Sequence, residues 1–208
     1  MSKKEYKRVT THSLLEMKTR KEKISMLTGY DYSMAKIIDK SGIDIILVGD
    51  SASNVMAGHE TTLPITLDQM IYHASSVVRG VQRALVVVDL PFGSYQSDPN
   101  EALRSAIKIM KESGAHAVKM EGGSEIQESI VKILNAGIPV MGHLGLVPRK
   151  STWVGGLRAV GKTPDEAFEL YKKFKRLEDA GAFSAECEII PENIMCEISK
   201  RTNIVTVS

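Results

Sequence analysis

Five hydrophobic runs in this chain each end at a cluster of polar or ionisable residues. The runs are DIILVGDS (44–51), ALVVVDLPF (84–92), AVKMEGG (117–123), PVMGHLG (139–145) and AFSAECEIIP (182–191). Each is typical of a β-strand buried on both faces, and the stretch between successive runs is long enough for a crossover helix. The pattern predicts repeated βα units around a parallel sheet, with polar residues gathered at the carboxyl ends of the strands. That edge is where α/β folds place their chemistry.

Helical patterns separate these runs and complete the repeat. They cover residues 14–23, 32–42, 67–80, 100–114, 124–137 and 164–181. Four of them end at a glycine suited to a left-handed C-cap, namely Gly42, Gly114, Gly137 and Gly181. Two further strands, at 24–30 and 203–208, bring the expected number of strands to seven.

The number of strands leaves two architectures to weigh. A (β/α)₈ barrel needs eight strands, whereas an open doubly wound sheet could hold seven. The first βα turn has no G-x-G-x-x-G pattern, and polar residues end nearly every strand. We therefore expect an α/β fold that is a (β/α)₈ barrel, with the C-terminal units missing from this chain.

Composition is that of one globular domain and excludes several classes of function. The chain has 208 residues, 43% of them hydrophobic, so we expect a single domain over residues 1–208. Its 27 basic and 25 acidic side chains give a net charge of +2, which does not favour a nucleic-acid partner. No apolar stretch has membrane-spanning length, and no secretory segment follows the charged N-terminus, so we expect a cytoplasmic protein with no membrane partner. Cys187 and Cys196 lack metal-ligand spacing and are expected to be reduced.

Three carboxylates end the middle strands. Asp50 and Asp89 each follow a run rich in Val, Ile and Leu, and Glu121 ends the next strand. An ionised carboxylate in such surroundings needs a compensating partner. Mg²⁺ is a natural one, because it takes one or two carboxylates and leaves positions for water and substrate. The alternative is that the aspartates cap the following helices or pair with Lys119 and an arginine.

Alternation along two strands places further charged side chains on the same face as their neighbours. Lys119 and Glu121 share one face, where the lysine could hold a substrate carboxylate or form a structural salt bridge. Glu186 and Glu188 share a face in the same way. One of these glutamates could act as a general base, or both could pair with basic residues of adjoining strands.

Other polar residues at this edge are candidates for orienting a ligand. His143 lies between glycines at a strand end, where it could orient substrate or be a hydrogen-bonded packing residue. Ser51 could bind an anion or cap a turn, and Tyr30 belongs to a polar cluster that could equally be aromatic packing. Trp153, in a stretch with two glycines, could form a lid or simply cover the core.

Several blocks of the sequence together resemble one enzyme family. They are TGYDYSMAK (28–36), LVGDSASNVMAGHETTLPIT (47–66), VVVDLPFGSYQ (86–96), VKMEGG (118–123) and GHLGLVP (142–148). In this order they resemble the corresponding blocks of the ketopantoate hydroxymethyltransferase family over almost the whole chain. The resemblance implies a barrel of the phosphoenolpyruvate/pyruvate type, an enzyme of pantothenate biosynthesis and a large homo-oligomer.

The resemblance also implies roles for individual residues. Asp50, Asp89 and Glu121 would form the Mg²⁺ site, and Asp50, Ser51, Asp89 and Lys119 would contact the α-keto acid. Matching the family's Glu-x-x-Pro pattern to Glu188–Pro191 makes Glu188 the catalytic proton acceptor, with Glu186 the second choice. The implied reaction transfers a hydroxymethyl group from 5,10-methylenetetrahydrofolate to 3-methyl-2-oxobutanoate through a Mg-bound enolate, giving 2-dehydropantoate.

Two other functions compete with this one. The first is a Mg²⁺-dependent carbon–carbon lyase or mutase of the same barrel superfamily, although such lyases usually carry a catalytic cysteine loop that has no counterpart near the middle strands here. The second is a non-catalytic, truncated paralogue, because the open strand edges of an incomplete barrel favour pairing with another chain. The departures at Ala52–Asn54 and at Glu186 from the family pattern indicate a divergent branch.

Overall fold

The computed structural model describes residues 7–147, 156 and 158–208, and its centre is a seven-stranded parallel sheet. The strands are β1 (Met26–Thr28), β2 (Ile45–Val48), β3 (Leu85–Asp89), β4 (Ala117–Glu121), β5 (Val140–Gly145), β6 (Ser184–Glu188) and β7 (Val205–Val207). They lie side by side in chain order, each paired in parallel with the next. All seven predicted strands are confirmed. In a doubly wound sheet the spatial order of the strands reverses at a switch point. The order here follows the chain without a reversal, which indicates a barrel.

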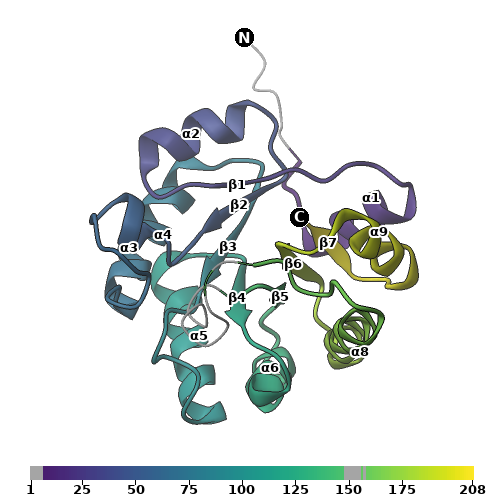
Figure 1. Ribbon diagram of the computed structural model, residues 1–208. Coiled ribbons are helices and arrows are strands. Elements are labelled where there is room, and N and C mark those ends of the chain that lie inside the picture. Colours follow the sequence, from purple (N-terminus) through teal and green to yellow (C-terminus); the bar gives the residue numbers. More distant parts are fainter. Residues whose placement is uncertain (1–6, 148–155, 157) are drawn as a thin grey trace.

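Helices cover the outer face of the curved sheet, as Figure 1 shows. They are α1 (Thr11–Thr19), α2 (Tyr32–Lys40), α3 (Ala52–Val55), α4 (Leu67–Gly80), α5 (Pro99–Ser113), α6 (Gln127–Asn135), α8 (Pro164–Ala180) and α9 (Glu192–Arg201), with a 3₁₀ turn, η1 (Ser124–Ile126), before α6. The C-cap prediction is confirmed most directly at Gly114 and Gly181, whose φ angles of 75° and 96° are left-handed. In the described part of the chain no helix is both long and apolar enough to cross a membrane.

Two parts of the helix prediction were wrong. The helix expected at 14–23 spans Thr11–Thr19, because Thr10 forms a capping box with Ser13 and so starts the helix earlier. Helices α3 and α9 were not expected at all. Helix α3 has only four residues, too few to show a helical period. Helix α9 is mostly polar and has only two buried residues, Met195 and Ile198, so its apolar face is not evident from the sequence.

Strand residues alternate between two separate apolar clusters. Residues facing outward, such as Val86 and Val88, pack under the helices in the larger cluster. Residues facing inward at the amino-terminal end of the strands, such as Val87 and Met141, form the second cluster together with the fully buried Leu14 of α1. Helix α1 therefore closes the lower end of the barrel, and the polar inward positions lie above this apolar floor.

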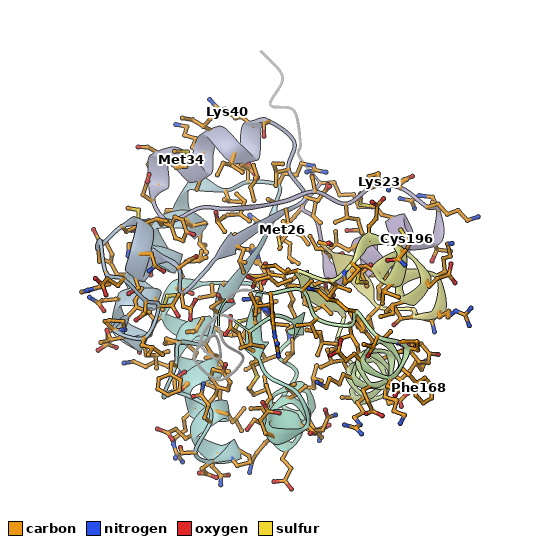
Figure 2. All side chains as sticks on the ribbon, in the orientation of Figure 1. Lys23, Met26, Met34, Lys40, Phe168 and Cys196 are labelled. Carbon is orange, nitrogen blue, oxygen red and sulfur yellow. The ribbon has the colours of Figure 1, made fainter. Side chains whose placement is uncertain are left out.

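The two cysteines lie in different surroundings. Cys187 faces the helix layer, opposite to Glu186 and Glu188, as alternation along the strand predicts. Cys196, labelled in Figure 2, is exposed on α9. Among the described residues, neither cysteine forms a disulfide bond.

Candidate active site

The register of the sheet brings the predicted polar residues together at the carboxyl end of the strands. Asp89 of β3 lies opposite Lys119 of β4, and one step further along, Glu121 of β4 lies opposite His143 of β5, which lies opposite Glu186 of β6. All five point inward. Asp89, Lys119, Glu121 and His143 lie at the same alternating positions as the inward apolar residues of their strands, and Glu186 lies between two residues that face the helices, Ala185 and Cys187. Adjacent inward residues of parallel strands are immediate neighbours, so the site is assembled by register alone.

Asp50 joins this cluster from the turn after β2. Its backbone N–H donates to Asp89 Oδ2 at 3.0 Å, and the side chains of both aspartates are almost completely buried. Burial, together with the nearby carboxylates of Asp89 and Glu121, raises the pKa of Asp50 to about 7. The pair is therefore a concentrated site of negative charge that would stabilise a bound cation.

Ser51 and Tyr30 lie beside the aspartates. Their hydroxyl oxygens are 2.8 Å apart, and the Tyr30 carbonyl accepts a hydrogen bond from His73 Nδ1 at 2.8 Å. The first contact joins the two side chains at the edge of the site, and the second holds the backbone of Tyr30. The structure thus brings Tyr30 into the cluster, and it shows an anchoring role for His73 that the sequence alone did not indicate.

Lys119 is buried among three carboxylates. Its ammonium lies 2.8 Å from Asp89 Oδ1, 3.0 Å from Glu186 Oε2 and 3.8 Å from Glu121 Oε1. Although burial alone would lower the pKa of this lysine, the carboxylates outweigh it, and the pKa of Lys119 lies well above its ordinary value. Lys119 is consequently a permanent cation at the centre of the site.

His143 is the second cation. Its Nε2–H donates to the Leu146 carbonyl at 2.6 Å, and its Nδ1 lies 3.2 Å from Glu186 Oε2 and 3.7 Å from Glu121 Oε1. Both ring nitrogens face acceptors, so both need a proton. Burial lowers the pKa of His143, but the carboxylates of Glu186 and Glu188 raise it to about 9 overall. The predicted orienting histidine is therefore an imidazolium that is hydrogen-bonded through Nε2 and has the Glu186 carboxylate close to Nδ1, although Nδ1 makes no hydrogen bond to a described residue.

The two glutamates of β6 have different surroundings. Glu186 contacts both cations, and these lower its pKa to about 2 despite its burial. Glu188 lies one register step further out, with its side chain 33% exposed and its Oε2 3.3 Å from His143 Nε2. Since that nitrogen already donates to Leu146, Glu188 is the less constrained carboxylate and the better placed to accept a proton from a ligand.

The backbone around Glu188 is unusually tight. Gly145 has φ of 101°, and a Cβ built there would lie 2.1 Å from the Glu188 carbonyl oxygen. The same carbonyl accepts a hydrogen bond from Leu146 N–H at 2.8 Å. Ile189, which follows, has a φ of 47°, a strained value for a β-branched residue. Only glycine at position 145 permits this approach of β5 to β6.

Tyr95 is a positioning residue that sequence reasoning missed. Its side chain is completely buried, and its hydroxyl donates to the Glu121 carbonyl at 2.9 Å and accepts from the Glu121 N–H at 3.2 Å. The Tyr95 hydroxyl thereby fixes the backbone that carries Glu121. The block VVVDLPFGSYQ contains this residue, but its letters do not show which way the tyrosine points.

The composition of the cluster fits a divalent cation. Among the residues that the structure describes, the barrel mouth holds two cations, Lys119 and His143, and five carboxylates, those of Asp50, Asp89, Glu121, Glu186 and Glu188. Among the described residues no group of three His, Cys, Asp or Glu side chains is arranged to hold a metal. Mg²⁺ does not need one, because it is commonly bound by one or two carboxylates with water and substrate. The adjacent pair Asp50 and Asp89 meets that requirement.

A cleft of about 130 Å³ opens beside the cluster. Its lining is Gly122, Gly123, Glu125, His143, Leu144, Gly145, Leu146, Val147, Val160 and Lys173. The cleft connects the buried imidazolium to the rim between the β4 and β5 loops. The lid predicted around Trp153 lies outside the described residues.

Comparison with known sequences shows the family. The family model described as ketopantoate hydroxymethyltransferase matches residues 8–208. A 3-methyl-2-oxobutanoate hydroxymethyltransferase of Flavobacterium johnsoniae is 66% identical over 98% of this chain and 75% of its own length. One from Cytophaga hutchinsonii is 63% identical over 99% of this chain and 76% of its own. The chain thus spans about three quarters of the length of these relatives.

Solved structures with little sequence identity share the fold. A 2,3-dimethylmalate lyase of the PEP mutase/isocitrate lyase superfamily is 16% identical, with a TM-score of 0.65 over 93% of this chain and 66% of that one. A phosphonopyruvate hydrolase, solved with oxalate and Mg²⁺, is 12% identical, with a TM-score of 0.65 over 96% of this chain and 80% of that one. These likenesses confirm the predicted barrel fold. The match of the family model to nearly the whole sequence, with relatives at 66% and 63% identity, shows that this chain belongs to the ketopantoate hydroxymethyltransferase family of enzymes.

Proposed function

We propose that this chain transfers a hydroxymethyl group from 5,10-methylenetetrahydrofolate to 3-methyl-2-oxobutanoate, giving 2-dehydropantoate. The observation that carries the proposal is the ring of charged residues set by the strand register, with Asp50 beside Asp89 and Lys119 at the centre. The names of the curated relatives at 66% and 63% identity support the same reaction. Pantothenate biosynthesis is the corresponding pathway.

Asp50 and Asp89 would hold Mg²⁺, with Glu121 joining directly or through water. A bound Mg²⁺ supplies Lewis acidity toward the keto oxygen of the substrate. Support comes from the excess of buried carboxylates and from the raised pKa of Asp50, which a cation would relieve. Ser51, which contacts Tyr30, would donate a hydrogen bond to the α-keto acid, and Lys119 would neutralise the substrate carboxylate.

Glu188 would be the catalytic base. Its carboxylate takes the proton from C3 of 3-methyl-2-oxobutanoate, and the electron pair of the broken C–H bond forms the C2–C3 double bond of the enolate. One water cleaves the methylene bridge of the folate, which releases tetrahydrofolate and leaves the one-carbon unit as formaldehyde. C3 of the enolate then attacks this carbon, the C=O bond opens to an alkoxide, and the alkoxide takes the proton held by Glu188. His143 positions Glu188 from one side, while Glu186 is kept ionised by its two cationic contacts and is the weaker base.

Deuterium exchange tests the enolisation step without folate. The chain is incubated with 3-methyl-2-oxobutanoate and Mg²⁺ in D₂O, and loss of the C3 proton is followed by NMR. Exchange should occur in the unmodified chain, disappear in Asp89→Ala and Glu188→Gln, and persist in Glu186→Gln. Equal losses in the two glutamine variants would contradict Glu188 as the base, and a folded chain without exchange would contradict the proposed function.

A carbon–carbon lyase is the second candidate function, because 2,3-dimethylmalate lyase has the same barrel fold. Incubation with 2,3-dimethylmalate separates the two functions, since a lyase would release a keto acid or acid fragment and a hydroxymethyltransferase would not. The resemblance to the family also leads us to propose a homo-oligomer in the cytoplasm. Light scattering on the purified chain tests the first of these.

A further inference from the structure

The carboxylate of Glu186 lies between the two cations of the site. Its Oε2 is 3.0 Å from Lys119 Nζ and 3.2 Å from His143 Nδ1. Asp89 is the other close partner of Lys119, but the Asp89 side chain is 5% exposed and that of Glu186 is 24% exposed. Glu186 is therefore the partner of Lys119 that can be reached from the barrel mouth.

Both cations already have carboxylates within 4 Å, although Nδ1 of His143 makes no hydrogen bond to a described residue. The Lys119 ammonium has three carboxylates within 4 Å, and His143 directs one nitrogen to the Leu146 carbonyl and the other to Glu186. Within the described residues, an incoming carboxylate would meet no free positive charge at the centre of the site. It can contact Lys119 only where an existing anion gives way.

We propose that Glu186 is an affinity-determining residue that occupies the carboxylate position on Lys119 until an α-keto acid displaces it. Glu186 is the anion that yields, because its side chain is longer and more exposed than that of Asp89. Its displaced charge stays in the site and repels the substrate carboxylate, which weakens binding further. The inference rests on the proposed function for the identity of the anion, 3-methyl-2-oxobutanoate.

Titration calorimetry with 3-methyl-2-oxobutanoate tests the inference in Glu186→Gln, which keeps the shape of the side chain and removes its charge. One series is run with saturating Mg²⁺ and one with EDTA, because loss of a carboxylate also changes the affinity for the metal. The Kd of Glu186→Gln should be about tenfold lower than that of the unmodified chain in both series, equivalent to about 1.4 kcal/mol. Glu186→Val, which removes the whole carboxylate arm, should tighten binding at least as much and serves if the glutamine variant does not fold.

Glu188→Gln is the matched control. Glu188 is on the same strand and face, carries the same charge and contacts His143 but is not among the ion-pair partners of Lys119. The Kd of 3-methyl-2-oxobutanoate for Glu188→Gln should differ from that for the unmodified chain by less than about threefold, because solvent screens the partly exposed charge of Glu188. Equal tightening in both glutamine variants would overturn the inference in favour of general repulsion.

Other outcomes also overturn it. Unchanged or weaker binding in Glu186→Gln would mean that Glu186 supports Lys119 rather than competing for it. Absence of binding in every folded variant would mean that Lys119 is no anion site. The proposed function fails separately, if the unmodified chain does not exchange the C3 proton, while tighter binding in Glu186→Gln would still stand.

Discussion

Alanine at position 145 should damage both stability and the placement of Glu188. Gly145 has a φ of 101°, and a Cβ there would lie 2.1 Å from the Glu188 carbonyl oxygen and 2.9 Å from Ile190 Cγ1. A non-glycine residue in this region costs about 1–3 kcal/mol. Separating the strand ends to relieve the contact would also break the hydrogen bond from Leu146 N–H to Glu188, worth about 1 kcal/mol. Together these losses predict a decrease of about 2–4 kcal/mol in the free energy of unfolding.

Gly137→Ala is the matched control. Gly137 also has a positive φ, 84°, but nothing lies within 4 Å of a Cβ built there. This variant should lose only the backbone component, about 1–2 kcal/mol. Urea unfolding of the two variants measures the difference. In the D₂O exchange assay Gly145→Ala should be slower by about 10²-fold, because a shift of about 1 Å in a reacting group costs that much, whereas Gly137→Ala should keep the rate of the unmodified chain.

Equal behaviour of the two alanine variants would contradict a special role for Gly145. If both alanine variants unfold at the same urea concentration, the close approach of β5 and β6 does not constrain the fold. If they also exchange the C3 proton at the same rate, the position of Glu188 does not depend on it.

Three further changes test the packing and electrostatics around the site. Tyr95→Phe should lower the free energy of unfolding by about 1–3 kcal/mol in urea titrations, because both backbone groups of Glu121 lose a buried partner. Gly142→Ala should cost about 1–3 kcal/mol, because its Cβ would lie 2.4 Å from Leu177 Cδ1, and adding Leu177→Ala should cost less than the sum of the two single changes in a double-mutant cycle. Burial lowers the pKa of His116 from 6.5 to about 4, so its protonation favours the unfolded chain and stability should fall as the pH drops from 6.5 to 4. His116→Gln should reduce that fall, as thermal melts at about pH 5 and about pH 8 would show, and an unchanged difference would exclude His116 as the cause.

The sequence determined the fold class and the location of the site. A strand that is buried on both faces needs apolar residues at both odd and even positions. This requirement produces continuous hydrophobic runs that can be recognised in the sequence, such as ALVVVDLPF. Polar residues at the ends of these runs stand out, so Asp50 and Asp89 could be chosen without coordinates. Parity along a strand also placed Lys119 with Glu121 and turned Cys187 away from Glu186, because the alternation of side chains is a local property.

Only the tertiary structure decided which of these groups touch. Contacts such as those of Lys119 with Asp89 and Glu186 depend on the register between strands that are about 30 to 70 residues apart in the chain, and no local pattern encodes that register. The same holds for the hydroxyl of Tyr95 on the Glu121 backbone and for the close approach that requires Gly145. The different environments of Glu186 and Glu188 arise in this way too, since two carboxylates of equal parity differ only in the neighbours that the folded barrel gives them.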